Sequence, residues 1–436
     1  MEQKWSGMMK RRDVYKSCLI LALLLCFCGL LYTSYAYVDS QVPNIIHLVV
    51  GEKEKFDFNL PIEADLLEKD MACISVNQGR KVDVDQIHFN FTQPFTMKSE
   101  NLGECKISLK LFGLINFKTI TVNVINETKV IPSGASIGVY IESDGVMVLG
   151  TSAITGEDGR NYEPALNVLK TGDYIVAING EKVEYKEELI EKIQKMKSAK
   201  IIFDVRRDNK NIKVTLNAIK CTDGDYKIGT WIRDNTQGIG TLTYVTTKGA
   251  FGALGHGITD VDTNLLMEID KGTLYNAKVL DIVRGQNGTP GEIVGMIKTG
   301  NGNDIGDIYK NTNQGIFGKI KNINYCIDSE HAIPIGMKQE IKLGKAKILC
   351  SVEGVIKEYE IEIEKIQMNN KKQNKGLVIK ITDDRLLNIT NGIVQGMSGS
   401  PIVQNGKLIG AVTHVFIQDS TRGYGTFIEN MLNSAQ

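Results

Sequence analysis

The sequence predicts a mainly β protein made of several domains behind a membrane anchor. It has 43 glycines in 436 residues, and many short runs rich in Val, Ile and Thr end at turn residues, which is typical of strands. The length exceeds what one hydrophobic core usually organises. Basic and acidic side chains number 51 each, so the composition indicates neither a nucleic-acid groove nor a polyanionic partner. We expect four regions in chain order: 1–40, 41–130, 131–220 and 221–436.

The first region carries a membrane signal. Four basic residues between positions 10 and 16 precede the uncharged apolar run Cys18–Tyr32. A basic flank of this kind stays cytoplasmic and directs the following chain outward. The run is intermediate in length between a signal-peptide core and a full span. We expect an uncleaved signal anchor, and the small residues Ser34 and Ala36 leave cleavage by signal peptidase as the alternative.

Residues 41–130 read as a small β-rich domain. Alternating runs such as Ile45–Val50 and Phe117–Val124 predict strands. No group of residues there suggests catalysis, so we expect this domain to space the rest of the chain from the membrane or to dock a partner.

Residues 131–220 resemble PDZ domains. The stretch Leu169–Gly180 has Gly-Asp and Asn-Gly corners that favour tight turns, and Glu187–Lys197 has apolar residues on one helical face. The resemblance implies a sheet edge beside that helix, where an extended peptide adds a strand. It also implies that the peptide-binding loop is formed by Ile137, Gly138, Val139 and Tyr140.

The run Gly396–Pro401 places Ser398 between small residues, just before two apolar runs joined by Asn405-Gly406. Asn-Gly is the preferred pair of a tight β-hairpin turn. Glycines beside a serine let backbone N–H groups converge on a developing oxyanion. Ser398 is therefore a candidate nucleophile, whereas an ordinary Gly/Ser-rich loop is the alternative.

Of the five histidines, His256 lies among small residues on a turn and is the first candidate for a proton shuttle. His414 and His331 are the alternatives in the same region. His47 and His88 fall in the N-terminal β-rich region.

Three stretches resemble the stage IV sporulation protein B peptidases, namely FGALGHGITD at 251–260, ITDDRLL at 381–387 and GIVQGMSGSPIVQNGKLIGAVTHVF at 392–416. The resemblance implies a chymotrypsin-like double β-barrel in residues 221–436. It also implies a catalytic triad of His256, Asp383 and Ser398, with backbone N–H groups of Gly396 and Ser398 as the oxyanion hole.

The acid is the least typical member of this triad. In chymotrypsin-like enzymes the acid lies far upstream of the serine, on the other barrel, whereas Asp383 is close to Ser398 in sequence. Asp260 or Asp281 could orient the histidine instead. Asp384 is a further alternative.

The resemblance implies a membrane-tethered serine endopeptidase outside the cytoplasm, in the space between forespore and mother cell. Such an enzyme releases itself by self-cleavage and clips a membrane-bound regulator, which triggers sigma-factor processing. Its partners would be that protein substrate and a peptide ligand of the PDZ domain, which could be its own segment. The alternative is a non-catalytic envelope scaffold that binds partner peptides.

We expect no cofactor and no metal site. The eight cysteines have no zinc-ligand spacing near a histidine. Buried free thiols are expected, with a bridge between Cys73 and Cys105 as the alternative.

Overall fold

A computed structural model describes residues 2–66, 74–77, 88–197, 200–286, 288–300, 302–321, 331–370 and 373–436. The chain forms two compact units. The first comprises Met1–Glu127 with Met337–Glu340 and Gln367–Lys371, and the second contains the remaining residues. Cys73 lies outside the described residues, so the alternative bridge to Cys105 is not described.

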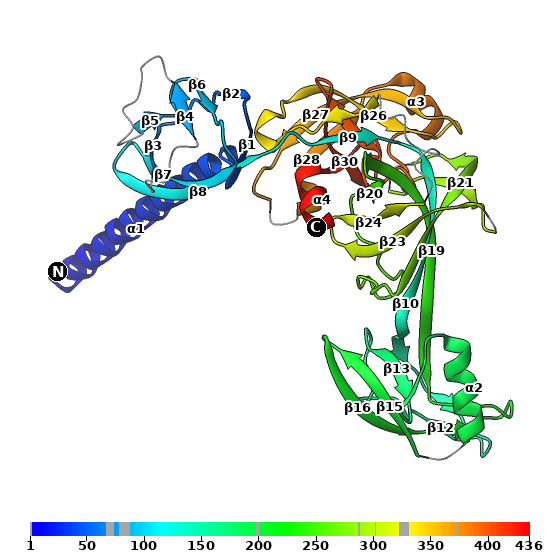
Figure 1. Ribbon diagram of the computed structural model, residues 1–436. Helices are drawn as coiled ribbons and strands as arrows, with labels where there is room; N and C mark the ends of the chain where they lie inside the picture. The colour runs from blue at the N-terminus through cyan, green and yellow to red at the C-terminus, as the bar shows by residue number, and fades with distance from the viewer. Residues whose placement is uncertain are drawn as a thin grey trace. The chain divides into compact units, whose positions relative to one another are not determined.

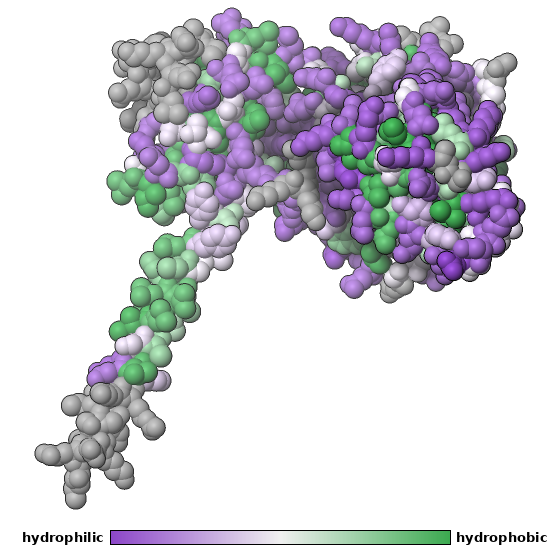
Figure 2. Space-filling view, turned by 90° about the horizontal axis from the view of Figure 1, so that it is seen from below, coloured by the Kyte–Doolittle hydropathy of each residue, from purple (hydrophilic) through white to green (hydrophobic). Residues whose placement is uncertain are grey.

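The first unit begins with helix α1 (Glu2–Gln41). Its part Asp13–Gln41 is long and apolar enough to cross a membrane. Figure 2 shows this part of the helix as a largely apolar rod. Only its end joins a core, through Val38 and the following Val42.

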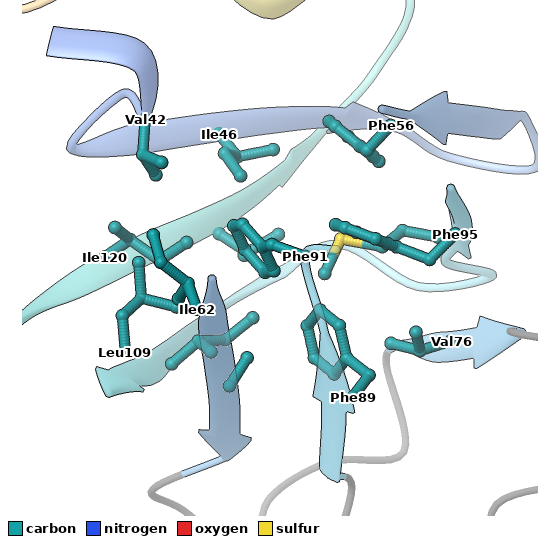
Figure 3. Packing of buried hydrophobic residues seen from close by; sticks show 14 of the residues in the cluster. Val42, Ile46, Phe56, Ile62, Val76, Phe89, Phe91, Phe95, Leu109 and Ile120 are labelled. Atoms are coloured by element: carbon teal, nitrogen blue, oxygen red, sulfur yellow. The ribbon is translucent and has the colours of Figure 1, made fainter. Parts of the chain in front are cut away.

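Two sheets follow α1 and confirm the predicted β character of this region. The first sheet has the order β1-β8-β7-β3-β5, with β1 parallel to β8. Its strands are β1 (Ile45–Val49), β3 (Ile62–Leu66), β5 (His88–Asn90), β7 (Gly103–Leu111) and β8 (Ile115–Ile125). The second sheet contains β2 (Lys53–Phe56), β4 (Ser75–Asn77) and β6 (Phe95–Lys98). Figure 3 shows the core between them, where the rings of Phe89 and Phe95 lie 4.9 Å apart.

The second unit contains a 13-stranded sheet. Its strands are β9 (Lys129–Pro132), β10 (Ser136–Thr151), β13 (Tyr174–Ile178), β14 (Glu181–Lys182), β15 (Lys200–Arg207), β16 (Lys210–Asn217), β19 (Thr230–Thr246), β20 (Ala250–Ala253), β21 (Lys271–Val283), β22 (Glu292–Ile297), β23 (Asp304–Thr312), β24 (Gly315–Ile320) and β25 (Ile333–Pro334). The long strands β10 and β19 pair with each other along most of their length (Figure 1).

One end of this sheet forms the PDZ domain. Its core takes side chains from Val146 to Ile228, including Leu189 and Ile193 of helix α2 (Lys186–Met196). The short strands β11 (Ile154–Thr155), β12 (Asn161–Tyr162), β17 (Ile219–Lys220) and β18 (Tyr226–Lys227) complete it.

The predicted boundary between PDZ and peptidase regions differs from the structure. Ile137, Val139 and Ile141 belong to another core, which they share with Leu242, Phe251 and other residues of the peptidase region. The PDZ domain is thus inserted within the first peptidase sheet, because β10 enters it and β19 leaves it.

The second peptidase sheet is a closed barrel with the order β26-β27-β28-β31-β30-β29. Its strands are β26 (Gly344–Cys350), β27 (Lys357–Ile366), β28 (Leu377–Ile381), β29 (Pro401–Gln404), β30 (Lys407–Val415) and β31 (Arg422–Phe427). Helices α3 (Asp384–Thr390) and α4 (Ile428–Ala435) complete this part. The predicted Asn-Gly hairpin is confirmed, since Asn405 and Gly406 have φ angles of 51° and 75°. The predicted fold class is confirmed, with the first peptidase sheet continuous with the PDZ sheet.

Candidate active site

The turn that carries Ser398 is held against the first peptidase sheet. Thr241 of β19 donates its backbone N–H to the Ser398 carbonyl at 3.0 Å and its hydroxyl to the Gly396 carbonyl at 2.8 Å. Gly399 has a φ of +98°, and a Cβ there would lie 2.1 Å from the Thr241 carbonyl oxygen. Glycine is therefore required for this close approach. The turn is a rigid connection between the two halves of the peptidase region.

His256 and Ser398 line the same cavity of about 510 Å³. Gly396 and His414 also line it, as does the β19 segment Thr236–Ile239. The structure therefore brings together the predicted proton shuttle, the predicted nucleophile and one predicted oxyanion residue.

The imidazole of His256 is fixed by its own turn. Its Nδ1 lies 2.9 Å from the Gly257 carbonyl oxygen. A carbonyl only accepts, so this hydrogen bond requires the proton on Nδ1 and leaves a lone pair on Nε2. Burial lowers the pKa of His256, although the Gly257 carbonyl opposes this effect. The ring is thus neutral at pH 7, in the tautomer that a general base needs.

The Ser398 hydroxyl donates to the Thr413 carbonyl at 2.7 Å. The hydroxyl is directed at Thr413, and among the described residues no hydrogen bond joins Ser398 to His256. Rotation about one side-chain torsion redirects the hydroxyl, which is a small change for a serine. Within the described residues, the backbone N–H groups of Gly396 and Ser398 donate to no protein acceptor. The predicted oxyanion donors are therefore available to a ligand.

Asp383 does not join this group. It is the N-cap of α3, where its side chain accepts from the Arg385 backbone N–H. Its oxygens also accept from the Arg385 guanidinium, at 2.7 Å and 3.0 Å, and from the Glu360 backbone N–H at 3.1 Å. Hydrogen bonding by Arg385 lowers the pKa of Asp383 to about 2. The predicted triad is not assembled here, because the carboxylate is committed to a capping and ion-pair role.

The alternative acids and the third histidine do not line the cavity either. Asp260 is fully buried and pairs with Arg233 while capping the turn at Thr263. Asp281 and Asp384 are exposed, as is His331.

His414 is the polar neighbour of the His256 ring. The two ring centroids are 5.0 Å apart, and His414 Nδ1 is buried without a hydrogen-bond partner among the described residues. Burial, the adjacent His256 and Lys375 lower the pKa of His414 to about 4. From the sequence, His414 was expected only as an alternative base. Its position beside His256 depends on the register of β30, which sequence spacing does not specify.

The predicted PDZ loop at 137–140 is wrong. Ile137, Gly138, Val139 and Tyr140 lie inside β10, paired to β19 on one side and to β21 on the other. A strand paired on both sides offers no edge to a peptide.

The start of β19 and the residues before it lie beside α2 instead, tied to both ends of that helix. Asp234 accepts from the backbone N–H of Lys186 at the first turn of α2. Gln194, near the end of α2, exchanges two hydrogen bonds with the backbone of Tyr226. The segment between these ties, Ile228–Arg233, contains a left-handed glycine (Gly229, φ +70°). Its strand residues Thr230–Arg233 pair with β10 and with no other strand that the structure describes.

Residues 224–432 match the SpoIVB peptidase S55 family. This region belongs to that family. It is a serine peptidase domain, and its boundaries include His256, Ser398 and the cavity between them.

Other similarities are more distant. The regulator of sigma-W protease RasP of Bacillus subtilis is 26% identical over 288 residues, which cover 62% of this chain and 62% of RasP. The PDZ domain of an SdrC-like protein of Listeria innocua is 27% identical, covers 21% of this chain and 94% of that chain, and has a TM-score of 0.18. The active form of the Rv3671c protease from M. tuberculosis is 12% identical, covers 46% of this chain and 74% of that chain, and has a TM-score of 0.25. The fold assignment rests on the strand pairing described above.

Proposed function

We propose that this protein is a membrane-tethered serine endopeptidase in which Ser398 is the nucleophile and His256 the general base. The observation that carries the proposal is that both line one cavity in a domain of the SpoIVB peptidase family.

The geometry supports a complete acyl-transfer cycle. Once the Ser398 hydroxyl turns from the Thr413 carbonyl, Nε2 of His256 takes its proton as the oxygen attacks a peptide carbonyl. The backbone N–H groups of Gly396 and Ser398 stabilise the oxyanion. The imidazolium then protonates the leaving amine, and water repeats the sequence to release the acyl group. In this conformation the Gly257 carbonyl, rather than Asp383, orients the imidazole.

The family resemblance adds a biological setting to this chemistry. We propose that α1 anchors the chain with the catalytic domain outside the cytoplasm, between forespore and mother cell. The enzyme cleaves itself and then clips a membrane-bound regulator, so that sigma-factor processing begins. The apolar helix and the family membership of residues 224–432 support this assignment.

The test separates the peptidase from a non-catalytic scaffold. Purified full-length protein in detergent is treated with a fluorophosphonate probe, and its self-cleavage products are measured by mass. We expect labelling at Ser398 and fragments that Ser398→Ala does not produce. Absence of labelling together with equal fragmentation of both proteins contradicts the peptidase proposal and favours the scaffold.

We propose a second role, the binding of an extended peptide in a groove formed by α2 and the strand edge Thr230–Arg233. The Thr230 hydroxyl is buried without a hydrogen-bond partner in the described part of the chain. Ile190 of α2 is 48% exposed, so it offers an apolar contact beside the strand edge Thr230–Arg233.

Peptide binding can be measured with a library of extended peptides and the full-length Ser398→Ala protein. We expect Ile190→Asp in α2 to weaken binding at least about tenfold, because it places a charge in the groove. Glu187→Gln on the same helix is the matched surface control. Equal binding by the two variants contradicts this location.

A further inference from the structure

The turn between β7 and β8 exposes three large apolar side chains. Phe112, Leu114 and Ile115 are 64%, 87% and 62% exposed. Phe112 and Gly113 both have positive φ angles, 53° and 70°, so the turn is tight and its side chains project from its end. Turn tips are normally polar, and adjacent apolar residues there indicate a contact surface.

The strand that follows this turn, β8, contacts the C-terminal end of helix α1 within the first unit. The Phe117 ring packs edge-to-face on Tyr35 of α1, with centroids 5.1 Å apart. Lys118 Nζ bonds to the Asp39 carboxylate at 2.8 Å and to the Val42 carbonyl at 2.7 Å. Successively earlier residues of β8 thus meet successively earlier residues of α1.

Following β8 back from Phe117 toward the turn extends this pairing of β8 with α1. Ile115 precedes Phe117 by two residues, about 7 Å of extended strand, which equals the rise of roughly four to five helical residues. From Tyr35 this step reaches the level of the apolar residues Leu30 and Leu31. In Figure 1 the turn of the β7–β8 hairpin lies on the same side of this unit as the free part of α1.

Tyrosines of α1 mark the same level. Tyr32, Tyr35 and Tyr37 are 73%, 49% and 63% exposed, and they follow the apolar run of the helix. Tyrosine at the end of a spanning helix is typical of the membrane–water interface. The turn therefore lies where the helix enters this interface.

We infer that Phe112, Leu114 and Ile115 form a second membrane contact, inserted in the outer interfacial region of the bilayer next to the anchor. The inference rests on the proposed anchoring role of α1. The charges near the turn set a shallow depth. Glu63 lies beside Gly113, and Lys110 is paired with Asp65. Only the apolar tip enters the lipid.

Single tryptophans in the full-length chain test this inference. The background variant carries Trp5→Phe and Trp231→Phe, which removes both native tryptophans. Leu114→Trp reports the turn, Leu24→Trp reports the anchor, and Glu52→Trp reports an exposed turn at the far end of β1. Each variant is reconstituted in phosphatidylethanolamine–phosphatidylglycerol vesicles with and without brominated acyl chains.

We expect blue-shifted emission and loss of fluorescence in brominated vesicles at positions 114 and 24, and neither at position 52. Quenching at 24 with water-like emission at 114 overturns the inference and leaves the anchor in place. Absence of quenching at 24 removes the anchor itself. Equal quenching at 52 and 114 contradicts a specific role for the turn.

Discussion

The surroundings of His256 and those of Asp383 differ in how many hydrogen-bonding groups remain available. At Asp383, both carboxylate oxygens are taken by Arg385 and by the Glu360 backbone N–H. At the cavity, which His256, Gly396 and Ser398 line, no hydrogen bond within the described residues uses Nε2 of His256 or the backbone N–H groups of Gly396 and Ser398. Partners within the protein stabilise a fold, whereas available groups next to a cavity serve a ligand.

Ser398→Ala is expected to change the rate of peptide cleavage most. Loss of the nucleophile should reduce peptide cleavage at least about a thousandfold, because no other hydroxyl takes its place. Ser400→Ala is the matched control, since that buried hydroxyl donates only to the Met397 carbonyl. Cleavage is followed by the appearance of a new amine terminus. If both variants retained activity, the cavity would not be the active site.

Gly396→Ala tests the oxyanion donors. Gly396 has a φ of +97°, and a Cβ would lie 3.0 Å from the Ile293 side chain, so alanine strains the backbone that carries the N–H and crowds Ile293. We expect a roughly ten- to hundredfold fall in kcat, with KM little changed. Gly406→Ala has a similar φ, +75°, but its Cβ meets nothing within 4 Å. A fall in kcat of the same size in both variants would assign the effect to backbone strain alone.

Asp383→Asn should act mainly on stability. The pKa of Asp383 is depressed to about 2 from 3.8, so the ionised form is favoured in the folded state. The ionised Asp383 carboxylate adds about 2 kcal/mol to the free energy of unfolding above pH 4, and this stabilisation is lost as the pH falls toward 2. Urea unfolding of the variant measures the difference, with Asp384→Asn as the exposed control. A fully folded Asp383→Asn protein with cleavage reduced a thousandfold would restore the acid role that the family resemblance implies.

The smallest expected effect is on the pH profile. Burial lowers the pKa of His256, so the neutral ring needed as a base persists below pH 6.5. The acid limb of kcat/KM should therefore lie below 6.5. His414→Asn removes the other histidine that lines the cavity. The kcat/KM profile of this variant should keep the same acid limb, because that limb reports the titration of His256. An acid limb above 6.5 would indicate an environment that stabilises the imidazolium instead.

The sequence was sufficient to predict groups that depend on local pattern. The Asn405-Gly406 hairpin and the Gly-flanked Ser398 are set by short-range backbone preferences, and His256 was identified by its small neighbours and by resemblance. Partners that depend on long-range pairing were not predictable. Ile137–Tyr140 and Ile228–Trp231 both contain an Ile-Gly pair, and only the pairing of β10 with β21 shows that the first offers no free edge. The role of Asp383 as the acid stays a prediction, and resemblance of sequence says nothing about Arg385 as a competing partner.

Strands β10 and β19 each run through both the PDZ domain and the first peptidase sheet. A truncation between the two parts therefore cuts through structure that both of them need. A truncation at residue 220 would strip Ile137, Val139 and Ile141 from the hydrophobic interior of the peptidase. Loss of activity after such a deletion would report collapse of the catalytic half, and would say nothing about peptide recognition. Point substitutions in the groove, which leave both strands intact, are the informative genetic route.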